Sequence, residues 1–121
     1  MTLTEFLEAR LSEDEQVATE AAKDHGTSHW IVSSEENVIP DPLAGNSYVA
    51  VGPWDGGVGE SAYHIARHDP ARVLAECESK RQIVEYFEDW ISAEPAARTT
   101  LRLLALPYSS HPDYRAEWAT S

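Results

Sequence analysis

The sequence predicts an α+β fold in a single domain over residues 1–121. Three observations indicate it: an amphipathic helix at the N-terminus, short β-branched and aromatic runs separated by turn residues, and a long capped helix followed by a second C-terminal helix with an aromatic tail. A small antiparallel sheet of about three strands is expected between the helices. A chain of 121 residues suits one hydrophobic core.

The first predicted helix covers residues 5–23. Apolar residues recur at helical spacing along it, with Glu5 and Glu8 in the first turn, where carboxylates suit the positive end of the helix dipole. Gly26 follows as a stop signal, because glycine readily adopts the conformation that closes a helix.

Three short segments are expected to form the sheet. Residues 29–33 and 47–51 are rich in β-branched and aromatic side chains, and residues 62–67 supply the third strand. The intervening segment 52–59 holds four glycines and a proline, which is typical of a turn. We do not expect a phosphate loop there, since no Lys followed by Ser or Thr completes the motif.

Asp69 and Pro70 predict the start of the long helix. The carboxylate can accept a first-turn N–H, and proline fits the first helical position because its missing N–H has no partner there anyway. The helix is expected to end near Ser92, ahead of Pro95. A further helix over residues 96–105 and an aromatic tail over residues 108–118 complete the chain.

The chain is acidic, with a formal net charge of −12, and the acidity is concentrated in residues 1–60. A field of this sign repels phosphates, so we expect no direct binding of nucleic acid, and no membrane association. The expected partner is a protein with a basic surface, or a second copy of the chain in a homodimer. In such a dimer the local concentration of bases at Arg67, Arg72, Lys80 and Arg81 would meet the acidic half of the other copy.

Cys77 is the single cysteine, so no internal disulfide can form. The N-terminus is charged where a secretory signal would be apolar. Together these observations predict a cytoplasmic protein. Cys77 also falls on the core-facing side of the long helix, where we expect a buried, inert thiol. No cofactor and no metal are expected.

Four blocks of the sequence resemble family 6221 of the domain-of-unknown-function series, found in actinobacteria and their phages. The blocks are FLEARLSEDEQVA (6–18), HIARHDPARVLAECESKRQIVE (64–85), TLRLLALPY (100–108) and HPDYRAEW (111–118). The resemblance implies no activity. It does imply that many members carry a cysteine cluster of a kind that could hold zinc, between the second and third blocks.

In this chain the corresponding stretch, residues 86–98, contains no Cys or His. We therefore expect no zinc there, and expect Phe87, Trp90 and Ile91 to pack in its place. Residues 28–60 are longer and less typical than the short tryptophan-rich hairpin of the family.

A non-catalytic protein-binding or regulatory module is the favoured function. The candidate partner-binding residues are the acids of the first helix and the aromatics of the tail: Glu5, Glu8, Glu13, Asp14, Glu15, Tyr108, Tyr114 and Trp118. One alternative is a phage or defence-related inhibitor whose carboxylates imitate a nucleic acid backbone. Another is a metal-dependent hydrolase using His64, His68 and His111, since imidazoles bind divalent metals.

Overall fold

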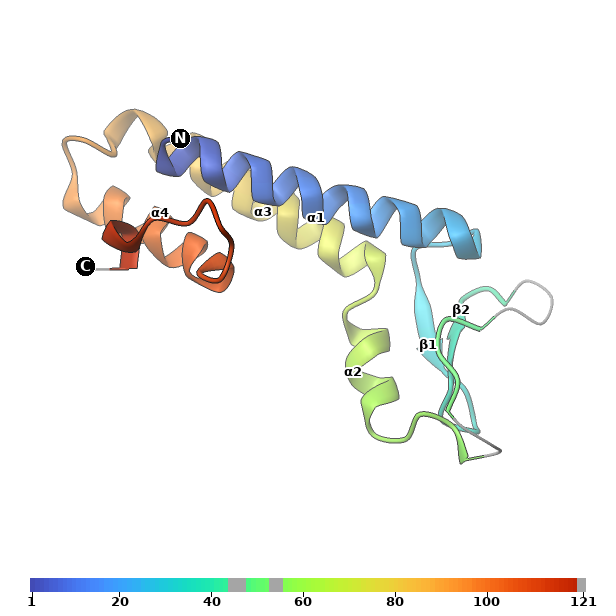
Figure 1. The fold of residues 1–121 in the computed structure, drawn as a ribbon. Coiled ribbons are helices and arrows are strands. Elements are labelled where there is room, and N and C mark those ends of the chain that lie inside the picture. The colour runs from blue at the N-terminus through green and yellow to red at the C-terminus, as the bar shows by residue number, and fades with distance from the viewer. Residues whose placement is uncertain (44–47, 53–55, 120–121) are drawn as a thin grey trace. The chain divides into compact units, whose positions relative to one another are not determined.

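The computed structural model describes residues 1–43, 48–52 and 56–119. Contacts within the chain form two compact units (Figure 1). The first, called the core unit here, combines Met1–Glu13 with Glu76–Ser121, and the second, called the sheet unit, is Asp14–Ala75. The single domain expected from the sequence stays a prediction.

The architecture is α+β, as predicted. In chain order the elements are α1 (Leu3–His25), β1 (Trp30–Val32), β2 (Val38–Pro40), α2 (Ser61–Arg67), α3 (Pro70–Phe87), the 3-10 turn η2 (Glu88–Trp90), α4 (Pro95–Ala105), and the 3-10 turns η3 (Leu106–Tyr108) and η4 (Ala116–Ala119). The predicted first, long and C-terminal helices are therefore confirmed, with bounds shifted by a few residues. The sheet and the segment before α3 differ from the prediction.

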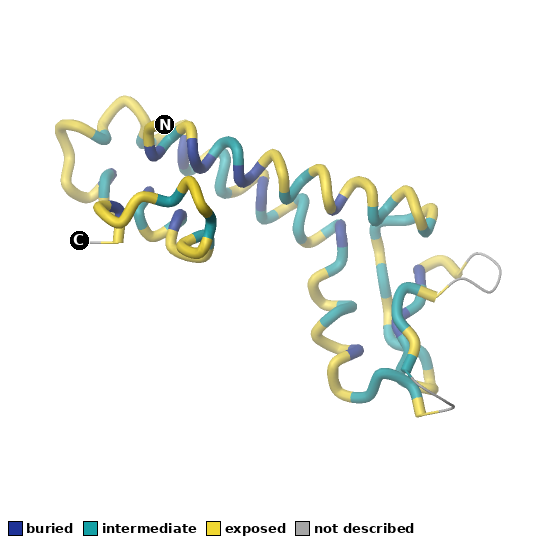
Figure 2. Tube along the Cα trace, viewed as in Figure 1, coloured by how far each residue is buried: buried dark blue, intermediate teal, exposed yellow. Residues whose placement is uncertain are grey.

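The core unit is built on an apolar cluster from three helices and the tail. Its buried members are Leu3, Phe6, Leu7, Val84, Leu101, Ala105 and Trp118. Figure 2 shows buried positions recurring along α1, as expected when one stripe of a helix faces a core. In α4 the buried residues Ala97, Leu101 and Ala105 are four apart, so they lie on one face.

An ion pair also joins α1 to α3 within the core unit. The guanidinium of Arg81 donates to a carboxylate oxygen of Glu8, and both side chains are partly buried. Arg81 is one of the bases that we expected to meet a second copy of the chain. In the structure this base binds a carboxylate of its own chain.

Among its described residues, the sheet unit contains one antiparallel pair of strands, β1 and β2, with Ile31 opposite Ile39. The prediction of three strands was wrong in two places. Residues 48–51 form only an isolated bridge, between Ala50 and Val38, and Ser47 lies outside the described residues. β2 was not predicted, because Pro40 and Pro42 made its segment resemble a turn.

Residues 62–67 form helix α2 and not a strand. A run of six or seven residues is too short for periodicity to separate a strand from two helical turns. Ala62 is fully buried, and α2 contacts β1. The long helix α3 is therefore preceded by a short helix and not by a strand. Residues 53–55 of the predicted turn lie outside the described residues.

Asp69 caps α3 as predicted, and it also holds β1. One carboxylate oxygen accepts the N–H of Arg72 at 3.0 Å, and the other accepts the N–H of Trp30 at 3.2 Å. Pro70 occupies the first helical position. One side chain thus satisfies a helix end and a strand in the same unit.

We expect Asp69→Ala to lower the free energy of unfolding by about 1.5 kcal/mol, because both N–H groups lose their acceptor. Urea unfolding followed by far-UV circular dichroism measures this loss. Asp69→Asn is the matched control. It keeps one side-chain oxygen as an acceptor, so its loss in the free energy of unfolding should be roughly half that of Asp69→Ala. If Asp69→Ala and Asp69→Asn lowered the free energy of unfolding equally, the two carboxylate oxygens would not contribute independently to stability.

α3 ends at Phe87, and η2 continues the helical path to Trp90 before Pro95 starts α4. Phe87 and Ile91 pack against the core cluster, as expected. Trp90 does not: it is 55% exposed, so the prediction that it packs in place of a metal was wrong. The neighbouring Tyr86 is 73% exposed. Two large aromatic side chains therefore face solvent at this end of α3.

Candidate protein-binding surface

The structure gives the acids at the start of α1 roles within the chain. The side-chain oxygen of Glu5 accepts the backbone N–H of Thr2 at 2.9 Å, while the Thr2 hydroxyl accepts the N–H of Glu5 at 3.1 Å. This reciprocal pair is a capping box, which satisfies N–H groups at a helix start. The hydrogen bonds from Thr2 hold the pKa of Glu5 below its ordinary value. Glu5 therefore serves to begin the helix.

Glu8 and Glu13 bind arginines of the same unit. Glu8 accepts from Arg81, as described above, and Glu13 accepts from Arg10 at 3.1 Å. Asp14 and Glu15 are half-buried and also make interactions within the chain. Each of the five candidate acids of α1 thus has a contact of its own inside the protein.

The aromatic tail packs on Phe6. Trp118 is buried, with its ring 5.1 Å from that of Phe6, and Tyr114 makes an edge contact with both rings. The ring of Tyr108 also meets that of Phe6 edge to face, with ring centroids 6.3 Å apart. This placement gives the three tail residues a part in closing the core unit, and their binding to a partner stays a prediction.

The histidines proposed as metal ligands belong to different units, His64 and His68 to the sheet unit and His111 to the core unit. His64 lies on α2 and His68 directly follows that helix; their ring centroids are 4.4 Å apart, and His68 Nδ1 donates to the carbonyl of His64. His111 belongs to the core unit, where Arg10 donates to its ring. Within residues 1–43, 48–52 and 56–119, no three His, Cys, Asp or Glu side chains are placed to hold a metal ion. Cys77 is buried, as expected.

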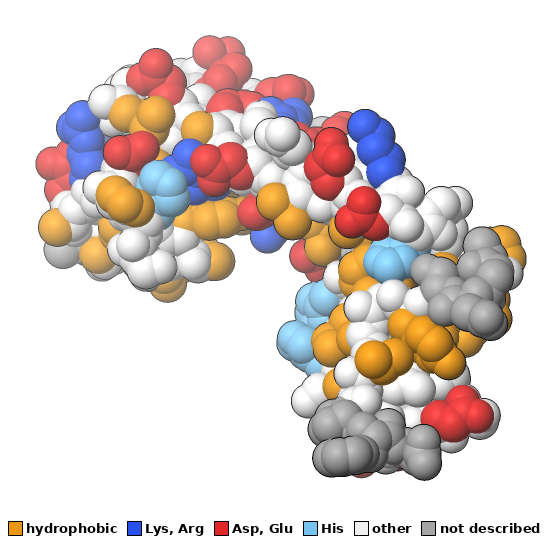
Figure 3. Space-filling view, turned by 45° about the vertical axis from the view of Figure 1, so that its right-hand side comes forward, with side chains coloured by type: hydrophobic (Ala, Val, Ile, Leu, Met, Phe, Trp, Pro, Cys, Tyr) orange, Lys and Arg blue, Asp and Glu red, His pale blue; other side chains and the backbone are white. Residues whose placement is uncertain are grey.

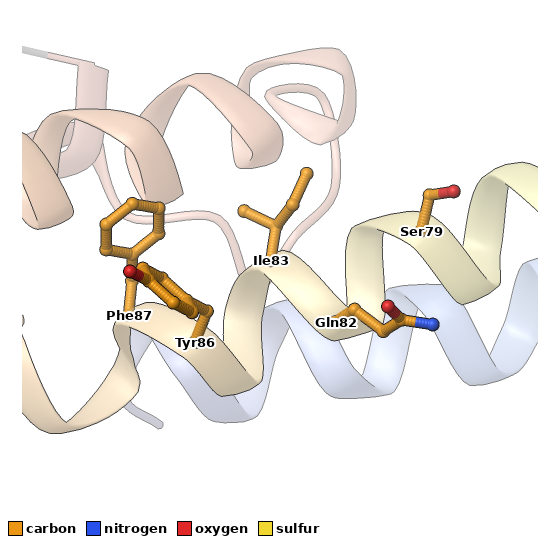
Figure 4. A pocket seen from close by; sticks show the side chains of 5 residues that line it. All are labelled: Ser79, Gln82, Ile83, Tyr86 and Phe87. Atoms are coloured by element: carbon orange, nitrogen blue, oxygen red, sulfur yellow. The ribbon is translucent and has the colours of Figure 1, made fainter.

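A shallow hollow lies on the exposed side of α3. It has a volume of about 460 Å³ and is lined by Ser79, Gln82, Ile83, Tyr86 and Phe87, a set called the α3 strip here. Figure 4 shows Ile83 and Phe87 pointing toward the C-terminal part of the chain, in agreement with their packing on the core cluster. The floor of the hollow is therefore continuous with the core.

Tyr86 forms one wall of this hollow. Its ring meets the edge of Phe87, with centroids 5.0 Å apart and planes at 87°. Trp90 lies one helical turn beyond Tyr86. A partly buried floor beside large exposed aromatics is typical of protein-binding surfaces, where Tyr and Trp supply contact area at small cost in conformational entropy.

Three carboxylates run beside the α3 strip and are called the acid row here: Glu78, Glu85 and Asp89. Glu78 and Glu85 directly precede Ser79 and Tyr86 of the α3 strip, and Asp89 directly precedes the exposed Trp90. The spacing of seven residues places Glu78 and Glu85 on one side of α3, and Asp89 follows in η2. Figure 3 shows that acidic side chains are also scattered elsewhere on the molecule, so this row is distinguished by the apolar surface next to it.

Sequence reasoning did not select the α3 strip. The core stripe of α3 runs through Cys77, Val84 and Phe87, and Tyr86 falls outside it. The available signal was Tyr86, a large aromatic residue outside the core stripe. The sequence analysis did not use this signal, because it expected the neighbouring Phe87, Trp90 and Ile91 all to pack inside the protein.

Comparison with known proteins gives a family but no activity. The model of the family of unknown function DUF6221 matches residues 1–120. No curated protein and no solved structure matches the chain significantly. Within the described residues, no helix has both the length and the apolar character needed to cross a bilayer.

Proposed function

The chain belongs to the family of unknown function DUF6221, and we propose that it acts as a non-catalytic protein-binding module that docks its partner on the α3 strip. The observation that carries this proposal is the exposure of Tyr86, which lines an apolar hollow, together with the exposure of Trp90 four residues later in the chain. In the free protein both rings are in contact with water. Burying the rings against a partner would remove this apolar surface from water, which favours binding.

The hollow extends the core and does not interrupt it. Ile83 and Phe87 are held by the core cluster, so the floor of the site is fixed before a partner arrives. A preorganised surface favours affinity, because few side chains have to be ordered on binding. The candidate acids of α1 have contacts within the chain, and for this reason the proposal places the docking face on α3.

A photo-cross-linking experiment tests the proposal. Tyr86 is replaced by the photoreactive analogue p-benzoyl-phenylalanine in the full chain, expressed in cells that naturally make it, and cross-linked proteins are identified by mass spectrometry. Tyr63 is the matched control, because it is also a tyrosine on a helix and is 51% exposed. We expect a defined protein to be captured from position 86 and not from position 63.

Tyr86→Ser should then weaken binding of the captured protein by about 30-fold, the size of effect typical of an aromatic residue that dominates an interface. Tyr63→Ser should leave the dissociation constant unchanged. Isothermal titration calorimetry with the purified partner measures both. Capture of the same proteins from both positions, or of none from position 86, would overturn the proposal.

A further inference from the structure

The acid row suggests what kind of segment occupies the α3 strip. We infer, on the basis of the function proposed above, that the occupant is an amphipathic helix of another protein, with an apolar face and Lys or Arg along one edge. The apolar face would cover Ile83 and Tyr86. The basic edge would meet Glu85 and Asp89.

The charges beside the strip are available for a partner. Glu78 accepts a hydrogen bond from Gln82 at 3.1 Å. Within the described part of the chain, Glu85 and Asp89 take part in no ion pair, and both are exposed. Carboxylates without a cation of their own beside a desolvated apolar contact favour a basic partner over a neutral or acidic one.

The arginine nearest the acid row is already paired. Arg81, four residues before Glu85, binds Glu8 of α1. None of the residues that line the hollow is basic. The charge at the edge of the hollow beside Gln82 and Tyr86 is therefore negative.

The dimensions of the surface suit a helix. From Ser79 to Phe87, the last residue of α3, the helix rises about 12 Å, which matches roughly two turns of a second helix. The side chains of Ser79, Gln82, Ile83, Tyr86 and Phe87 form a hollow of the kind into which a helix packs. A partner helix would use apolar anchors at positions i, i+3 or i+4, and i+7.

A second copy of the chain suits this surface poorly. It would bring the same carboxylates, and the strip offers no base to receive them. With a net charge of −12 per chain, two copies also repel one another at low salt. The inference therefore commits to a different, basic protein.

Synthetic peptides test the charge and the helical face. The probe is an amphipathic peptide of leucine and lysine, with all leucines on one helical face. One control has the same composition in an order that gathers the leucines on no face, and a second has glutamate in place of every lysine. Binding to the full chain is measured by calorimetry at several salt concentrations, and the binding face is mapped by NMR chemical shifts.

We expect the amphipathic leucine–lysine peptide to bind with shifts centred on the α3 strip and the other two to bind at least tenfold more weakly. Tyr86→Ser should weaken binding at least tenfold, and the double variant E85Q/D89N about fivefold. The matched double variant E35Q/E60Q removes the same charge from exposed positions of the sheet unit and should change little.

Equal binding of the glutamate peptide, or of the peptide without a leucine face, would overturn the inference. So would equal effects of E85Q/D89N and E35Q/E60Q, because binding would then follow net charge alone. A partner captured at position 86 that presents no basic helix, or a second copy captured there, overturns the inference but leaves a docking function at Tyr86 intact. Absence of capture at position 86 overturns the proposed function itself.

Discussion

Replacing Phe6 with alanine should lower the free energy of unfolding by about 4 kcal/mol. The Phe6 ring is fully buried and contacts the rings of Tyr108, His111, Tyr114 and Trp118, while the Arg10 guanidinium lies 5.2 Å from its centroid. Removing the ring leaves a cavity beneath the aromatic side chains of the tail, which lose their contacts with it. Urea unfolding followed by circular dichroism and tryptophan fluorescence measures the loss.

A residue on the same helix supplies the control. Val17 is also apolar and lies in α1, but it is 70% exposed, so Val17→Ala should change the stability by less than about 0.5 kcal/mol. If Phe6→Ala cost no more than Val17→Ala, the aromatic cluster would not be the centre of the core unit.

Replacing His111 with lysine should lower the free energy of unfolding by about 2 kcal/mol. Arg10 is a buried cation whose guanidinium donates to the His111 ring and to Glu13. The Nδ1 atom of His111 also accepts the backbone N–H of Asp113 at 3.0 Å. Lysine offers no acceptor to these donors and places a second positive charge beside Arg10.

His111→Asn separates charge from shape. Its side-chain oxygen can still accept hydrogen bonds, and it adds no charge, so its cost should be less than half that of lysine. NMR spectra of the tail, read at Trp118, should show the larger change in the lysine variant. Equal losses in the two variants would mean that ring packing on Phe6, and not the acceptor for Arg10, is what His111 contributes.

The helices could be predicted because local signals and burial agree along them. Asp69 and Pro70 define the start of α3 by the chemistry of the first turn alone, whereas Pro95, expected only to end the preceding helix, is itself the first residue of α4. The apolar pattern of α1 likewise predicted the burial of Phe6, Leu7, Leu11 and Ala18, but Val17, which belongs to the same pattern, is 70% exposed. Such features depend on residues only a few positions apart.

The sheet unit was predicted less well because its elements are short. β2 has three residues, and its pairing with β1 is a contact between segments whose own sequences give weak signals. α2 has seven residues, and it is helical although the same letters fit a strand. In both cases tertiary contacts decide the local structure.

The candidate site could be predicted only in part. The sequence shows that the chain is acidic and that a partner should be basic. It does not show that Glu8 binds Arg81, because that pairing depends on how α1 and α3 meet. Nor does it show that Trp90 is exposed while Phe87, three residues earlier, is packed.

The discontinuous makeup of the core unit has a consequence for synthesis on the ribosome. Leu3, Phe6 and Leu7 emerge first, yet Trp118, which covers Phe6, is translated more than a hundred residues later. At 5–20 residues per second, this interval lasts on the order of ten seconds. During that time the apolar side chains at the start of α1 are exposed to solvent or to a chaperone, and the unit can close only after the residues up to Trp118 have been translated.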